Sequence, residues 1–172
     1  MRYLSMLVIG FILVPSIALA GERLTPRPVD SLAAEIFERA QARSAVVRSL
    51  VTTLESSNVL VHIETSWELP PGIGGLTRFV TASGGYRYVR ITISADLRMG
   101  ERTTILGHEL QHACEIAASS ADDLASLRRL FGSVGHRDGE FYETAAAQRV
   151  EHDVRQELRA GSVRATRALP GK

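Results

Sequence analysis

The segment His108-Glu109-Leu110-Gln111-His112 combines two potential metal ligands with a potential general base. On a helix, His108 and His112 would lie one turn apart on the same face, so both imidazoles could reach one ion at about 2.0–2.1 Å. Glu109 would lie about a hundred degrees further around the helix, where it can reach a water beside the ion. The spacing therefore predicts one Zn2+ ion and hydrolysis of a peptide or other amide bond, with Glu109 as the general base.

A catalytic zinc ion needs a third protein ligand and an open fourth position. The residues after the motif, Glu115 to Ser119, provide neither the glycine nor the third histidine of the metzincin pattern. Glu143 is favoured, because it opens a predicted helix whose alanines, residues 145–147, would allow close packing on the motif helix. The complete set of potential ligands downstream of the motif is His136, Glu140, Glu143, Glu151 and His152.

The hydrophobic pattern before the motif predicts a helix and then a sheet. Apolar residues recur at helical spacing over residues 32–54, which indicates one long N-terminal helix. Alternation with a period of two predicts strands at 59–64, 76–81 and 86–94. Ser-Gly-Gly at 83–85 is typical of a tight turn, so the last two strands should form a hairpin. We expect a small, mostly antiparallel sheet.

Helices are predicted from the motif onwards, which makes the fold class α+β. The motif helix covers residues 101–118 and directly follows a strand, whose edge could hold an extended peptide by backbone pairing. A short helix near 120–130 and a loop at 135–139 precede a last helix at 140–159. In this arrangement the motif helix is followed by a helix that carries Glu143.

The spacing of these residues resembles that of the gluzincin clan of zinc metallopeptidases, particularly its small single-domain members. His108-Glu109-x-x-His112 is followed by Glu143, 31 residues further on (143 − 112), on a separate predicted helix. The resemblance implies a zincin-like fold with His108, His112 and Glu143 as zinc ligands and Glu109 as the catalyst. Many gluzincins also place an acid four residues after the ligand glutamate, where it orients a zinc histidine. Here that position is Ala147, so the orienting group must come from elsewhere.

Other polar residues have less specific patterns. We interpret His152, nine positions after Glu143, as a surface histidine, since it would face away from the ion. His62 lies on the less apolar face of a predicted strand. Cys114 is the single cysteine, which excludes an intrachain disulfide, and we expect it to be a buried packing residue. No pattern singles out an oxyanion stabiliser among the candidates Tyr86, His136, Tyr142 and Arg149.

The N-terminus has the three parts of a secretory signal peptide. Arg2 supplies a positive charge, residues 4–14 are apolar, and Ala-Leu-Ala at 18–20 forms a cleavage site before Gly21. The pattern predicts an exported protein, periplasmic or secreted, with no membrane partner after cleavage. An uncleaved N-terminal membrane anchor is the alternative, which Pro15 and the small-residue site disfavour.

Length and composition indicate one folded domain. The chain has 172 residues, of which 45% are hydrophobic and 23% charged, as in globular proteins. We expect a signal peptide at 1–20, an extended lead-in at 21–29, a zincin-like metallopeptidase domain at 30–160 and a flexible tail at 161–172. A formal net charge of +1 gives no reason to expect a nucleic-acid partner. The expected partner is a peptide or protein substrate.

Three alternatives to peptide hydrolysis remain open from the sequence. A catalytically inactive zincin-like domain could bind zinc or a partner without turnover, and an amidase could act on cell-wall material. The five-residue motif could also have arisen by chance on a structural helix. The sequence leaves the oligomeric state and the cleavage specificity open.

Overall fold

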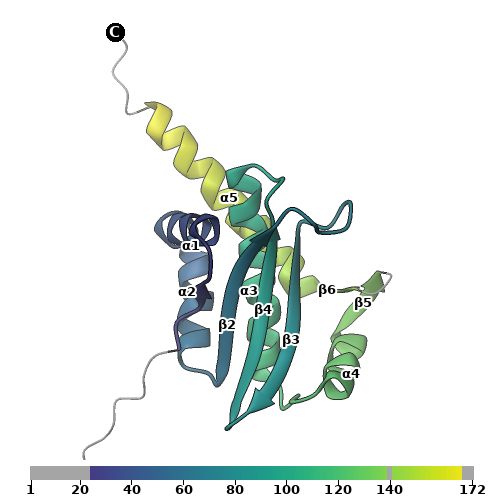
Figure 1. Cartoon of the computed structure of the whole chain (residues 1–172). Coiled ribbons are helices and arrows are strands. Elements are labelled where there is room, and N and C mark those ends of the chain that lie inside the picture. The colour runs from purple at the N-terminus through teal and green to yellow at the C-terminus, as the bar shows by residue number, and fades with distance from the viewer. Residues whose placement is uncertain (1–23, 139–140, 168–172) are drawn as a thin grey trace, which may run out of the picture.

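The computed structural model describes residues 24–138 and 141–167, and the predicted signal peptide at 1–20 lies outside these ranges. The described part has an α+β fold, in which one central helix lies against a four-stranded sheet (Figure 1). The predicted α+β class is therefore confirmed. Among the described helices, none is long and apolar enough to cross a membrane.

The sheet is mixed, which corrects the expectation of a mostly antiparallel one. Its strands, in the spatial order β1-β2-β4-β3, are β1 (Arg27–Pro28), β2 (Val59–Ser66), β4 (Tyr86–Ser94) and β3 (Gly75–Ser83). Strands β3 and β4 pair antiparallel, whereas β1 with β2 and β2 with β4 run parallel. After β2 the chain crosses to the far edge, forms β3 and returns in a hairpin that inserts β4 beside β2. Alternating hydrophobicity locates strands but does not determine their neighbours.

The hairpin between β3 and β4 confirms the predicted tight turn. Gly84 and Gly85 have φ angles of 61° and 82°, which glycine adopts without the steric cost that a Cβ atom would bring. Positive φ at both central residues is the requirement of a type I′ turn, whose twist matches that of the flanking strands. The hairpin leaves β3 at one edge of the sheet.

The predicted long N-terminal helix is two helices, α1 (Ser31–Arg43) and α2 (Ala45–Glu55). Ser44 separates them with extended φ and ψ angles of −127° and 120°. Its buried hydroxyl accepts a hydrogen bond from the Val47 N–H at 3.0 Å and so caps α2. The apolar positions keep their helical spacing across the break, because both helices turn their apolar faces towards the same core.

Asp30 connects the start of α1 to the sheet. Its carboxylate accepts hydrogen bonds from the Ala33 N–H at 2.8 Å and, on β2, from the Thr65 N–H at 2.8 Å. Burial alone would raise the pKa of this carboxyl, but these hydrogen bonds outweigh burial and hold the pKa below its ordinary value. The cap therefore also fixes α1 relative to the end of β2.

Helix α3 (Met99–Ala118), which carries the motif, is the centre of the fold. It contacts β3 and β4 on one side and α1, α2 and α5 on the other (Figure 1). Leu106, Leu110 and Ile116 of α3 are almost completely buried. They share one hydrophobic core with the inward-facing residues of β2 and β4, which are Val59, Val61, Ile63, Val89, Ile91 and Ile93. Both faces of α3 are thus fixed by packing.

The C-terminal part differs from the sequence prediction in two places. Helix α4 (Leu124–Val134) is followed by a hairpin of β5 (Gly135–Asp138) and β6 (Phe141–Thr144), where a loop and the start of a helix were expected. Helix α5 (Ala145–Arg167) begins after Thr144, whose hydroxyl caps it by accepting from the Ala147 N–H at 3.1 Å. It continues through Gly161, so the predicted tail at 161–172 is helical up to Arg167.

Arg87 fixes the C-terminal end of α3 to the sheet. This side chain on β4 is only 7% exposed, and it also donates to the Asn58 side-chain oxygen. The last carbonyls of a helix lack intrahelical donors and carry partial negative charge, and the guanidinium satisfies both needs. Its acceptors are the carbonyl oxygens of Ile116 at 2.6 Å, Ser119 at 2.8 Å, Ala117 at 3.1 Å and Ala121 at 3.3 Å.

We predict that Arg87→Met lowers the free energy of unfolding by about 3 kcal/mol or more, because several buried carbonyls lose their donor together. The matched control is Arg90→Met on the same strand, where an exposed arginine pairs with Glu64 at 3.7 Å. This control should lose less than about 1 kcal/mol. Urea unfolding followed by circular dichroism measures both, and equal losses would contradict the role of Arg87.

Candidate metal centre

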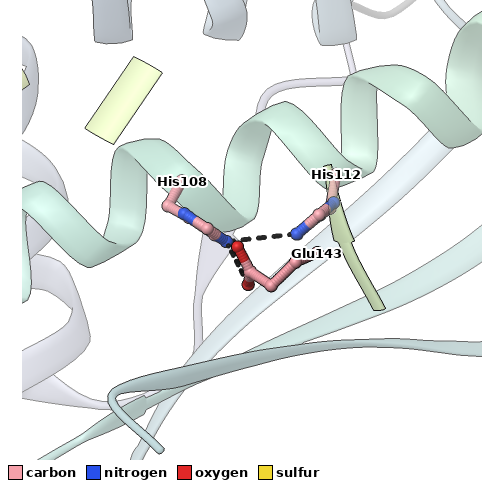
Figure 2. Close-up of side chains that lie close together, drawn as sticks. All are labelled: His108, His112 and Glu143. Carbon is pink, nitrogen blue, oxygen red and sulfur yellow. Dashed lines mark hydrogen bonds and ion pairs between the residues drawn. The ribbon is translucent and has the colours of Figure 1, made fainter. Parts of the chain in front are cut away.

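Helix α3 brings the two motif histidines to one point. His108 and His112 lie one turn apart, and their Nε2 atoms are 3.2 Å from each other (Figure 2). Both side chains are buried, with 5% and 6% exposure. Their rings are nearly perpendicular, at 74°, so the two nitrogens approach each other edge-on without stacking of the rings. The two imidazoles therefore lie close enough to reach one ion, as their spacing in the motif predicts.

Glu143 reaches the same point from strand β6. Its Oε1 atom lies 3.1 Å from His108 Nε2. Figure 2 marks this contact with a dashed line. The sequence predicted Glu143 on a helix, but it lies two residues before α5, in the strand that pairs with β5. The predicted helical position of Glu143 is therefore wrong, and the β5–β6 hairpin places its side chain beside His108.

The three side chains could hold a metal ion. One ligand atom from each of His108, His112 and Glu143 lies within 4.8 Å of the others. In a tetrahedral site with metal–ligand distances of about 2.0–2.1 Å, neighbouring ligand atoms are about 3.3 Å apart. The observed separations of 3.2 Å between the imidazoles and 3.1 Å from His108 to Glu143 are close to that value. The geometry suits a cation without identifying the metal.

Glu115 orients His112. Its Oε2 atom lies 3.0 Å from His112 Nδ1, and its Oε1 atom accepts a hydrogen bond from the Thr144 hydroxyl at 2.7 Å. Burial would raise the pKa of the Glu115 carboxyl, but the hydrogen bonds from His112 and Thr144 lower it. A carboxylate next to Nδ1 favours the tautomer that carries its proton there, which would leave His112 Nε2 available to a metal ion.

Glu151 has the corresponding position beside His108. Its Oε2 atom lies 3.2 Å from His108 Nδ1, close enough for an ion pair, although the pair lacks hydrogen-bond geometry. The other carboxylate oxygen pairs with Arg155. The sequence placed Glu151 among the possible metal ligands, whereas the structure places it on the side of the imidazole away from Nε2.

Glu115 and Glu151 supply the orienting groups for the two histidines that the sequence left unassigned. Ala147 is completely buried, which lets α5 pack closely against the core. The signal for Glu115 was available, since it lies three residues after His112 on the same helix face. No sequence pattern predicts that Glu151 lies beside His108, because this contact depends on how α5 packs against α3.

Glu109 is buried beside the histidines and is 5% exposed. The Thr77 hydroxyl on β3 lies 2.7 Å from Glu109 Oε2, to which it donates. Burial raises the pKa of the Glu109 carboxyl, although His112 and His108 act in the opposite direction. Strand β3 comes close because residue 75 is glycine: a Cβ atom there would lie 2.8 Å from Glu109 Oε1. The edge strand thus holds the proposed base in place.

The local charge favours a cation. Burial would lower the pKa of His108, but Glu143, Glu109 and Glu151 together raise it above the ordinary value. The hydrogen bond from His108 lowers the pKa of Glu143. With Glu115, four carboxyl groups surround two imidazoles, an excess of negative charge that a bound divalent ion would offset.

The metal point opens into a cavity of about 400 Å³. The walls include β3 from Gly75 to Thr77, together with Phe131 and Tyr142. The rings of Phe131 and Tyr142 are stacked, with centroids 5.9 Å apart. Tyr142 is the one oxyanion candidate whose described side chain lines this cavity. Tyr86 and Arg149 are exposed elsewhere, and the side chain of His136 lies outside the described part.

Among the described residues, the other histidines lie outside the His/His/Glu group. His152 is exposed on α5 and His62 is exposed on β2, as predicted. Glu140 lies outside the described residues. Cys114 is buried, its thiol lies 3.7 Å from the Leu50 carbonyl oxygen, and burial raises its pKa to about 12. The predicted packing role of Cys114 is therefore confirmed.

The fold and site define an α+β protein in which two buried histidines and the half-buried Glu143 could hold a metal ion. No protein-family model, no curated protein and no solved structure matches the chain. Its function has to be inferred from the geometry described above.

We predict that His112→Ala weakens metal binding by more than the roughly 10–100-fold effect typical of residues that only orient a ligand. His152→Ala on α5 is the matched control, because it removes an exposed imidazole outside the site. Elemental analysis after dialysis against micromolar zinc measures the metal content of both variants. Equal metal content in the two variants would contradict the proposed ligand role of His112.

Glu115→Ala should weaken zinc binding by about 10–100-fold, because His112 loses the carboxylate that fixes its ring and its Nδ1 proton. Glu38→Ala removes an exposed carboxylate on α1 and should have no effect. Competition with a chromophoric chelator gives the Kd for each variant. A Kd that Glu115→Ala leaves unchanged would show that Glu115 serves only the packing of α3.

Proposed function

We propose that this chain is an exported zinc metallopeptidase in which His108, His112 and Glu143 bind the zinc and Glu109 is the general base. The observation that carries the proposal is the buried Glu109 carboxylate beside the paired histidines, in a cavity bounded by an edge strand. Export rests on the signal-peptide pattern of residues 1–20.

The ligand set supports zinc as the metal. Two imidazole nitrogens and one carboxylate oxygen are a common combination in catalytic zinc sites, which keep the fourth position for water or substrate. When bound, zinc would act as a Lewis acid and lower the pKa of a coordinated water towards about 7. The same ligand types in the same chain order support a relationship to gluzincins, although Glu143 lies on a strand here.

Strand β3 supports a peptide as the substrate. It is the edge strand of the sheet, and residues Gly75 to Thr77 line the cavity. An extended peptide could pair with this edge through its backbone, which would place one of its carbonyl groups near the metal point. Backbone pairing binds any sequence, so other contacts must determine specificity.

In the proposed reaction, the oxygen of a water attacks the peptide carbonyl carbon while Glu109 accepts a proton from that water. The carbon–nitrogen bond then breaks, and Glu109 donates the proton to the leaving amine. Burial makes Glu109 a stronger base, because a raised pKa means a higher proton affinity. The Thr77 hydroxyl donates a hydrogen bond to Glu109 Oε2. We propose that the Tyr142 hydroxyl donates a hydrogen bond to the developing oxyanion.

Glu109→Gln should lower the rate of peptide hydrolysis by about 100-fold or more while zinc content stays unchanged, because the amide cannot accept the proton. Glu38→Gln is the matched control and should keep full activity. The assay is mass-spectrometric analysis of products from denatured casein, with peptidoglycan digestion run in parallel. Undiminished cleavage by Glu109→Gln would rule out this mechanism. Zinc binding without cleavage by the unmodified protein would favour a non-catalytic binding domain.

A further inference from the structure

A second, larger cavity adjoins the metal centre. Its volume is about 1230 Å³, and it shares Gly72, Ile73, Gly74 and Ile105 with the wall of the smaller cavity. Its lining residues come from α1, α5, the first turns of α3 and the loop that joins β2 to β3. The two cavities therefore lie next to each other along α3 and share a wall, which residues 72–74 and Ile105 form.

The larger cavity is lined by basic side chains from three helices. Arg39 and Arg159 are exposed, and neither forms a hydrogen bond or ion pair with another residue in the described part of the chain. Asp96 and Glu101 are the acidic residues of this lining. The arginines are Arg39 and Arg43 of α1, Arg98 at the start of α3, and Arg155 and Arg159 of α5.

The positive charge there is only partly neutralised. Arg155 pairs with Glu151, and Glu101 accepts a hydrogen bond from the Arg98 N–H at 3.0 Å as part of the α3 cap. The start of α3 adds the positive end of a helix dipole to the same wall. Arginines from α1 and α5 raise the local potential above what the near-zero net charge of the chain suggests.

The size and the walls of the cavity fit a peptide segment. Its volume exceeds the range of about 300–1,000 Å³ that is typical of small-molecule sites. Apolar side chains lie between the arginines, including those of Leu69, Leu97 and Leu158. A guanidinium binds a carboxylate through paired hydrogen bonds, and apolar walls can cover the methylene groups of an acidic side chain.

We propose that the arginine-lined cavity is a substrate subsite for carboxylate groups, so that the chain binds acidic peptides. The peptide would extend from the metal point into the larger cavity and place acidic side chains against Arg39 and Arg159. As a statement about a substrate, this inference rests on the proposed peptidase function. The binding of acidic peptides to the cavity can be measured without any turnover.

The test uses fluorescein-labelled peptides of one length in which the variable positions are all Glu, all Gln or all Lys. Fluorescence anisotropy measures their binding to the zinc-loaded Glu109→Gln protein, which does not consume them. The Glu peptide should bind about tenfold or more tightly than the Gln peptide, and the difference should shrink as salt is raised. Equal affinities for the Glu and Gln peptides would overturn the inference.

A double substitution, Arg39→Gln with Arg159→Gln, should remove most of this preference and leave binding of the Gln peptide unchanged. The control, Arg48→Gln with Arg90→Gln, removes the same charge from arginines that do not line the cavity and should keep the preference. Loss of the preference in both variants would overturn the subsite, because it would show an effect of net charge alone.

The outcomes for the cavity and for catalysis are independent. If the acidic preference is present but the unmodified protein cleaves nothing, the subsite stands and the peptidase proposal fails. If cleavage depends on Glu109 but the Glu and Gln peptides bind equally, the peptidase stands and the subsite fails. In a cleaving protein, the Arg39 and Arg159 substitutions should raise KM for the Glu peptide and leave kcat unchanged.

Discussion

The close approach of α3 to its two neighbours is the constraint on which the candidate metal centre depends. Gly107, beside His108, lies so near α5 that a Cβ atom there would be 2.9 Å from Val154 Cγ2. On the other side of α3, a Cβ atom at Gly75 of β3 would lie 2.5 Å from Ile105 Cγ2 and 2.8 Å from Glu109 Oε1. A methyl group at either position would separate α3 from a neighbour that supplies a polar group, Glu151 on α5 or Thr77 on β3. The same packing therefore closes the core and assembles the site.

The polar groups assembled in this way are buried or half-buried, and each ionisable group has a defined partner. A carboxylate buried without compensation destabilises a fold strongly. Here His112 faces Glu115, His108 faces Glu143 and Glu151, and Glu109 accepts from Thr77. The partners hold each ring in one orientation with Nε2 towards the metal point, which a pair of histidines on an isolated helix could not achieve. Precise placement of ligands is thus a property of the tertiary structure.

The sequence predicted the features of this arrangement that depend on neighbouring residues, but not those that depend on contacts between distant segments. The motif helix and the β3–β4 hairpin were predictable, because helical spacing and paired glycines act over a few residues. The break at Ser44 was missed, because the apolar spacing continues across it and only the cap distinguishes two helices from one. The parallel pairing of β2 with β4 and the strand position of Glu143 depend on which segments pair in the fold. The periodicity of hydrophobic residues does not predict such pairings.

The three potential ligands also differ in how firmly the fold supports them. His108 and His112 lie on the most buried helix of the described structure, so their separation is fixed by the core. Glu143 comes from a short two-stranded hairpin whose main neighbours are α4 and α5. The hairpin also contacts α3 through two side chains, Glu143 at 3.1 Å from His108 and Thr144 at 2.7 Å from Glu115. A cation bound to all three ligands would add a further link between this hairpin and α3 and stabilise the assembled site by mass action. The pentapeptide therefore provides the two histidines that the core holds in place, and a bound cation would help to fix Glu143.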